Sequence, residues 1–191
     1  MLDAIINPKG MGENMIIGKV KINTNDLSFE YEGKHYSKEE AESLPMKAIT
    51  ITLKRKEWAE LCKYVMLGMW YMNEEIKEVF DITTNMRAML LSSRVRLCKE
   101  LRKRIFEYKT NNVEDYSVTL SLTEWATLRD CIWQGTSWVE EHTHKRKRRK
   151  DKESIGYKYH YMILRKEKEA YKSMTDEEEL SFLYNTAINY V

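Results

Sequence analysis

The sequence has few of the residues that form turns or disulfide bonds. Its 191 residues include only seven glycines and two prolines, so turns must be few and the regular elements long. An all-β sandwich, which needs turn residues at short intervals, is therefore unfavourable. The three cysteines stand far apart with no CxxC pair, which argues against a disulfide framework and favours a reducing compartment.

Long hydrophobic runs are absent as well. No stretch approaches the roughly 18 uninterrupted apolar residues of a membrane helix. Asp3 lies where a secretory signal peptide carries Lys or Arg, and the apolar run that follows is short. We therefore expect a soluble cytoplasmic protein with no membrane partner. Hydrophobic residues still make up 42% of the chain, which is enough for a packed core and excludes a disordered protein.

Catalytic and cofactor motifs are lacking too. The sequence contains no GxxxxGK[ST], GxGxxG, GxSxG or HExxH pattern. His142 and His144 are two residues apart, and on a helix such positions point to different sides, so they do not form a metal pair. We therefore predict a non-enzymatic protein with no catalytic residue, no cofactor and no metal site.

Positive charge is concentrated, although 32 Lys and Arg nearly balance 30 Asp and Glu. Segment 145–152 carries seven positive charges and one negative, and segment 94–104 carries six positive and one negative. Such clusters can bind the phosphates of a nucleic acid or an acidic protein surface. The first run can equally be a solvated loop. The candidate binding residues are Lys145, Arg146, Lys147, Arg148, Arg149, Lys150, Arg94, Arg96, Lys99, Arg102, Lys103 and Arg104.

The most informative feature is an internal duplication. Residues 51–74 align without gaps on residues 118–141, an offset of 67, with eight identities in 24 positions. The identical pairs include two rare tryptophans, Trp58 and Trp125, and two glycines, Gly68 and Gly135. We predict that the two copies pack with pseudo-twofold symmetry and that the glycines mark a close helix crossing or a bend. The strands of the two copies can pair with each other or with the N-terminal hairpin.

Periodicity predicts a predominantly helical α+β protein with an N-terminal β-hairpin and a small antiparallel sheet. Two alternating strands, 47–53 and 116–122, each precede long amphipathic helices. The predicted parts are a flexible arm (1–15), a hairpin with a short helix (16–46), a first strand–helix–helix repeat (47–110), and a second repeat with the basic loop 145–152 and a C-terminal helix (116–191). We expect them to form one compact domain, and a homodimer is possible.

The strand that leads into a capped helix resembles the opening of ribbon-helix-helix DNA-binding proteins. In that family two strands pair into a ribbon whose outward side chains read the major groove. The resemblance covers about a dozen residues per copy, and the first helix here runs past the family's usual length. The matching outward positions are Thr50, Thr52 and Lys54 in one copy and Ser117, Thr119 and Ser121 in the other.

Three hypotheses for function follow. The first is a non-enzymatic binding protein that engages nucleic acid, or a nucleic-acid-binding protein complex, through the basic clusters. In general composition the chain is similar to phage and mobile-element proteins that inhibit host defence systems, such as anti-CRISPR proteins. The alternatives are a ribbon-helix-helix-like transcriptional regulator and an enzyme acting on a nucleotide.

Overall fold

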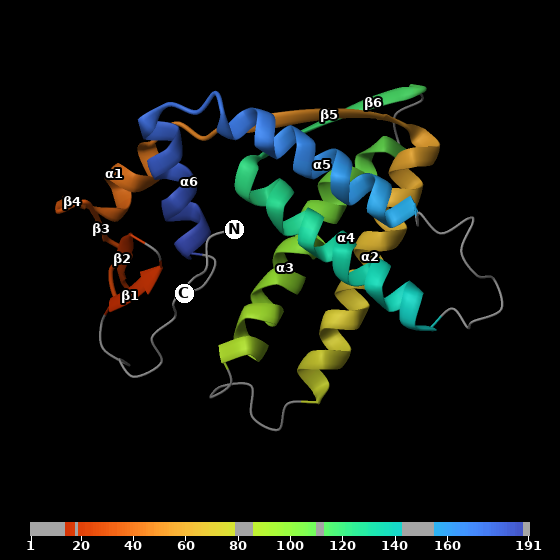
Figure 1. Cartoon of the computed structure of the whole chain (residues 1–191), viewed down its shortest axis with the longest axis horizontal. Helices are drawn as coiled ribbons and strands as arrows, with labels where there is room; N and C mark the ends of the chain where they lie inside the picture. The colour runs from red at the N-terminus through yellow and green to blue at the C-terminus, as the bar shows by residue number, and fades with distance from the viewer. Residues whose placement is uncertain (1–13, 18, 79–85, 110–112, 143–154, 189–191) are drawn as a thin grey trace. The chain divides into compact units, whose positions relative to one another are not determined.

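The computed structural model describes residues 14–17, 19–78, 86–109, 113–142 and 155–188 (Figure 1). The chain divides into two compact units. Residues 1–47 and 173–191 form the first, which we name the terminal unit, and residues 48–172 form the second, the repeat unit. The C-terminal helix, predicted as part of the second repeat, therefore belongs with the N-terminal hairpin. The assembly of all parts into one compact domain stays a prediction.

The terminal unit contains an antiparallel meander whose strands follow one another in sheet order. A two-residue turn at Glu32 and Gly33 joins two of its strands, and both residues have positive φ, as a hairpin turn of type I′ requires. The meander begins at Asn14, inside the segment predicted as a flexible arm. Its strands are β1 (Asn14–Ile17), β2 (Val20–Asn23), β3 (Phe29–Tyr31) and β4 (Lys34–Tyr36).

Two helices cover the terminal unit's core, α1 (Lys38–Ser43) and α6 (Asp176–Ile188). The predicted capping box at Ser37 is present: its hydroxyl accepts from the Glu40 backbone N–H, and the Glu40 carboxylate accepts from the Ser37 N–H. The alternating apolar residues of the hairpin pack with residues of α1 and α6 in one buried cluster. That cluster consists of Val20, Ile22, Phe29, Ala41, Leu180, Tyr184 and Ala187.

The repeat unit runs strand, helix, helix twice over, as the duplication predicts. The first copy comprises β5 (Ala48–Lys54), α2 (Arg55–Lys77) and α3 (Met86–Phe106), followed by the 3-10 turn η1 (Glu107–Lys109). The second copy comprises β6 (Asp115–Ser121), α4 (Leu122–His142) and α5 (Ile155–Tyr171).

The two strands of the repeats pair with each other, antiparallel, and Ile51 lies opposite Val118. These two residues are equivalent in the alignment of the copies, so a pseudo-twofold axis passes between them. The same axis relates the two tryptophans and their hydrogen bonds. Trp58 Nε1 donates to the Tyr116 carbonyl at 2.8 Å, and Trp125 Nε1 donates to the Ile49 carbonyl at 2.8 Å. Tyr116 and Ile49 are again equivalent positions, and both indole rings are fully buried.

The duplicated glycines mark the crossing of α2 and α4. A Cβ added to Gly68 would lie closer than 3.0 Å to the carbonyl group of Cys131, and one added to Gly135 would lie equally close to the Tyr64 carbonyl oxygen. Cys131 and Tyr64 are equivalent in the alignment. The predicted close crossing is therefore confirmed, and only glycine lets the two backbones approach this far. The predicted class, a predominantly helical α+β fold, is confirmed as well.

Candidate nucleic-acid interface

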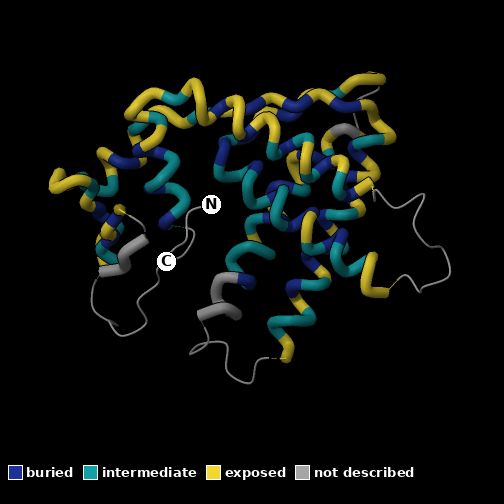
Figure 2. Tube along the Cα trace, viewed as in Figure 1, coloured by how far each residue is buried: buried dark blue, intermediate teal, exposed yellow. Residues whose placement is uncertain are grey.

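The ribbon formed by β5 and β6 has one buried and one exposed face. In β5 the exposed and buried positions alternate strictly along seven residues. The buried face carries Ile49, Ile51, Leu53, Val118 and Leu120, which pack toward the helices. Figure 1 shows the two strands running side by side, and Figure 2 shows exposed positions recurring along them. The outer face is therefore open in the repeat unit, as alternation with period two predicts.

The outer face is a row of small hydroxyl side chains. Thr50 Oγ1 lies 2.8 Å from Thr119 Oγ1, and Thr52 Oγ1 lies 2.7 Å from Ser117 Oγ. All four residues are exposed. Within each pair one hydroxyl donates and the other accepts, so the row keeps both donor and acceptor capacity for a further partner.

Both strands pass directly into capped helices. Ser121 accepts from the Glu124 backbone N–H at 3.2 Å, and Glu124 accepts from the Ser121 N–H at 2.7 Å, which completes the predicted capping box. At the equivalent junction Glu57 accepts from the Lys54 N–H at 3.2 Å. The Lys158 ammonium, 2.8 Å from Glu57, lowers the pKa of that carboxyl. These bonds fix the direction in which each helix continues from its strand.

One end of the ribbon carries three consecutive exposed cations, Lys54, Arg55 and Lys56. Lys54 Nζ lies 3.7 Å from a Glu114 carboxylate oxygen, and both side chains are mostly exposed. An exposed ion pair of this kind is worth about 0–1 kcal/mol, so it is readily exchanged for another anion. Arg55 donates to the Lys109 carbonyl at 3.2 Å. We define this segment, residues 54–56, as the charged end of the ribbon.

The basic cluster of α3 does not form one surface. Arg104 contacts the second repeat, where it pairs with Glu124 and donates to the Thr119 carbonyl. Arg102 is half-buried, with its guanidinium over the Phe106 ring, and Lys103 pairs with Glu100. Arg96 and Lys99 are exposed, and Arg94 is half-buried. The structure thus brings one predicted cation, Arg104, to the ribbon. The other cluster, Lys145–Lys150, lies outside the described residues.

An aromatic cluster connects α4 and α5. Trp133 packs edge-on against Tyr157 with ring centroids 5.2 Å apart, and His160 lies 4.9 Å from Trp133. Tyr161 is 56% exposed, whereas Tyr159 is fully buried and bonds Glu60. Tyr159 is therefore a core residue, whereas Tyr161 lies at the surface.

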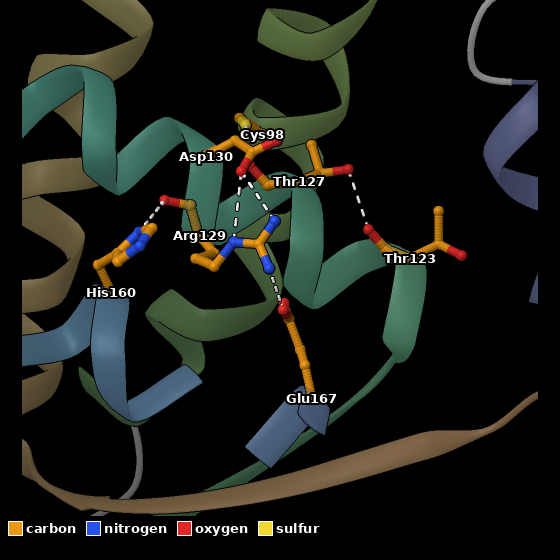
Figure 3. Close-up of polar contacts among 7 residues, drawn as sticks. All are labelled: Cys98, Thr123, Thr127, Arg129, Asp130, His160 and Glu167. Atoms are coloured by element: carbon orange, nitrogen blue, oxygen red, sulfur yellow. Dashed lines mark hydrogen bonds and ion pairs between the residues drawn. The ribbon is translucent and has the colours of Figure 1, made fainter. Parts of the chain in front are cut away.

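A buried ion pair fixes α5 on α4 (Figure 3). Arg129 of α4 pairs with Glu167 of α5 and also with its neighbour Asp130 at 3.0 Å. Glu167 is 1% exposed, and its second carboxylate oxygen, Oε1, has no hydrogen-bond partner among the described residues. Burial raises the pKa of Glu167 to about 7, and the Arg129 guanidinium opposes this rise. The pair is a structural clamp between helices and lies off the ribbon's outer face.

The three thiols are buried, so we expect them to be chemically inert in the folded protein. Burial raises the pKa of Cys62 to about 11 and that of Cys131 well above its usual value. Because the thiolate is the reactive form, a disulfide-exchange reagent such as DTNB should react about 100-fold or more slowly with native protein than with denatured protein, where three thiols should titrate. Rapid labelling of one thiol in the native state would contradict this expectation.

The described residues hold no group of His, Cys, Asp and Glu arranged to bind a metal ion. Among the helices of the described ranges, none combines the length and apolar character needed to cross a membrane. No family model, no curated protein and no solved structure matches this chain.

Two features of the repeat unit, one at the ribbon and one between α4 and α5, do not appear among the predicted residues. Arg55 and Lys56 carried a usable signal, because they follow the strand end directly and begin the helix. No sequence signal predicts the ion pair of Arg129 with Glu167. The two residues are 38 positions apart on different helices, and no local pattern specifies how those helices are rotated relative to each other.

Proposed function

We propose that this protein binds double-stranded DNA by placing the β5–β6 ribbon in the major groove. The observation that carries the proposal is the exposed row of hydroxyls on Thr50, Thr52, Ser117 and Thr119, on a ribbon whose other face is buried. The major groove admits a two-stranded ribbon, and Ser and Thr hydroxyls can donate to or accept from base edges. No catalytic group is needed for such a role.

The connectivity of the repeat unit supports the same proposal. Each copy is a strand followed by two helices, and the strands of equivalent positions pair antiparallel about a pseudo-twofold axis. This is the arrangement implied by the resemblance to ribbon-helix-helix proteins. The helices depart from that pattern, because α2 has 23 residues and α4 has 21.

Phosphate contacts would come from the charged end. Lys54, Arg55 and Lys56 are exposed beside the outer face, and phosphate contacts position a protein on the duplex while base contacts specify the sequence. The overall charge of only +2 implies that DNA affinity depends on these local cations.

A second candidate is binding of a nucleic acid, or of an acidic protein surface, through α3. The exposure of Arg96, Lys99 and Lys103 favours it. An inhibitor of a host defence complex, the function predicted first from composition, would use such a surface together with the run Lys145–Lys150.

The decisive experiment measures binding of a random duplex pool by fluorescence anisotropy for matched charge variants. Thr119→Glu places a carboxylate on the ribbon, facing the electronegative groove, and should weaken binding by about tenfold or more. Asn73→Glu makes the same charge change at an exposed position of α2 and should leave affinity within about twofold. Thermal unfolding of both variants checks that the fold is retained.

Two further variants test the second candidate. If Arg96→Glu/Lys99→Glu alone abolishes binding while Thr119→Glu retains it, the α3 surface is the binding site and the ribbon proposal is wrong. A pull-down with and without nuclease, comparing wild type with Arg146→Glu/Lys147→Glu/Arg148→Glu/Arg149→Glu, tests the basic run in the same way. A protein captured after nuclease treatment and lost with this variant would favour the inhibitor hypothesis.

A further inference from the structure

We infer that the ribbon prefers duplexes that contain thymine, because the methyl groups of Thr50, Thr52 and Thr119 contact the 5-methyl group of that base. This inference rests on the proposed function and deepens it, since it names the base that the outer face of the ribbon recognises. The same chemistry extends to 5-methylcytosine, which carries its methyl group at the equivalent ring position.

The outer face of the ribbon lacks the side chains that most often read purine bases. Its positions alternate with buried ones along β5 and β6, and the structure describes both strands in full. None of these outer positions holds Arg, Asn or Gln, whose bidentate hydrogen bonds distinguish G or A from other bases. The outer positions are Ala48, Thr50, Thr52 and Lys54 in β5 and Asp115, Ser117, Thr119 and Ser121 in β6.

Charged groups lie at the borders of this face and not at its centre. Arg55 donates to the Lys109 carbonyl at 3.2 Å, and Arg104 donates to a backbone carbonyl of β6 at 3.3 Å. Lys54 lies opposite Asp115 in the last pair of the strand ladder. The centre of the outer face therefore consists of three threonines and one serine.

The central hydroxyl groups are turned toward each other. Thr50 Oγ1 lies 2.8 Å from Thr119 Oγ1, and Thr52 Oγ1 lies 2.7 Å from Ser117 Oγ. A threonine β-carbon carries one hydroxyl and one methyl group. With its hydroxyl directed at the neighbouring strand, each threonine has its methyl group turned away from that strand. Because all four residues are exposed, these methyl groups belong to the surface that would meet the DNA.

Thymine is the base that a methyl group can recognise. Its 5-methyl group lies in the major groove, and apolar contact with a threonine methyl distinguishes it from the other bases. Ser and Thr hydroxyls, in contrast, bond to base edges of more than one kind. Burying one methyl group is worth about threefold to fourfold in affinity, so two such contacts would give a preference of about tenfold.

The test begins with selection of duplexes from a randomised library by the full chain. The selected duplex is then prepared again with deoxyuridine in place of thymidine, which removes only the 5-methyl groups. We expect A·T pairs to be enriched, and the deoxyuridine duplex to bind at least about threefold more weakly by fluorescence anisotropy at the same salt concentration.

Two matched variants assign this preference to the threonine methyl groups. Thr50→Ser/Thr52→Ser/Thr119→Ser keeps every hydroxyl and removes the methyl groups, so the ratio of affinities for the two duplexes should fall to about one. Thr50→Val/Thr52→Val/Thr119→Val keeps the methyl groups and removes the hydroxyls, so the ratio should be at least about that of wild type. Any effect of uracil on the shape of the duplex is common to all the proteins, and comparing the ratios cancels it.

The outcomes separate this inference from the proposed function. Equal affinity of wild type for the two duplexes, or duplex binding without enrichment of A·T pairs, would overturn the inference while duplex binding stands. A preference lost in the valine variant and kept in the serine variant would assign it to the hydroxyls and overturn the inference as well. Absence of any duplex binding would overturn both. Unchanged tryptophan emission of each variant confirms that the repeat unit is folded, since all five tryptophans lie within it.

Discussion

Replacing Gly68 by alanine is expected to lower the free energy of unfolding of the repeat unit by about 2–3 kcal/mol. The new methyl group would lie within 3.0 Å of the Cys131 carbonyl carbon and of its thiol sulfur. Overpacking of this kind costs about 1–3 kcal/mol and sometimes more, and the obstacle here is helix backbone, which moves only with the whole of α4. The gain of about 1 kcal/mol in helix propensity offsets part of the cost.

Urea unfolding followed by tryptophan fluorescence measures this effect, because every tryptophan lies in residues 48–172. Asn73→Ala, an exposed position of the same helix, is the control and should be neutral or slightly stabilising. Gly135→Ala should cost about as much as Gly68→Ala, because its Cβ meets the equivalent carbonyl of Tyr64. The double variant should cost less than the two losses together, since both act at one crossing. A Gly68→Ala protein as stable as wild type would contradict the close crossing.

The two glycine variants should behave alike because the glycines belong to two copies of one unit. The same duplication makes much of the fold of the repeat unit predictable from the sequence. The duplication places Trp58 with Trp125 and Gly68 with Gly135, and the structure uses each pair at equivalent positions about one axis. Once two strand–helix units are known to be copies, pairing their strands buries both apolar faces at once. The sequence left open whether those strands pair with the hairpin, because alternation specifies a face and not a neighbour.

The candidate site was only partly predictable. The outward hydroxyls of the ribbon follow from period two along each strand, whereas their pairing across strands depends on a register that the sequence does not state. The α3 cluster looked continuous along the chain. In three dimensions a helix distributes such a run around its axis, so Arg104 turns to Glu124 while Arg96 faces outward.

The second large effect is expected from the ion pair that clamps α5 to α4. Arg129→Met should lower the free energy of unfolding by about 3–5 kcal/mol near pH 8, because it leaves the Glu167 carboxylate buried without its cation. The contact of Arg129 with Asp130 adds little, since Asp130 is 42% exposed at its side chain. Urea unfolding followed by tryptophan fluorescence is again the measurement.

The pH dependence identifies the carboxyl group as the cause. Burial raises the pKa of Glu167 from 4.5 in the unfolded chain to about 7, so the folded state favours the protonated form. The stability that the protonated Glu167 carboxyl contributes is fully present below about pH 4.5 and is lost as the pH rises through about 7. The free energy of unfolding of wild type, relative to Glu167→Gln, should therefore fall between these values and level off above them. Arg129, Asp130 and Tyr171 face the same carboxyl and are present in both proteins, as is His160. A difference that stays flat across this range would contradict the raised pKa of Glu167.

Removing both charges separates the cost of burying a lone carboxylate from the loss of packing between α4 and α5. A buried ion pair can often be replaced by apolar residues of similar volume without loss of stability, because the desolvation of two charges disappears with their attraction. Arg129→Met/Glu167→Leu should therefore recover most of the stability that Arg129→Met loses, to within about 1 kcal/mol of wild type, and its stability should no longer depend on pH through this site. If the double variant is as unstable as Arg129→Met, the lone buried carboxylate is not the cause of the loss. The packing and hydrogen-bond geometry of the Arg129 and Glu167 side chains would then hold α5 on α4.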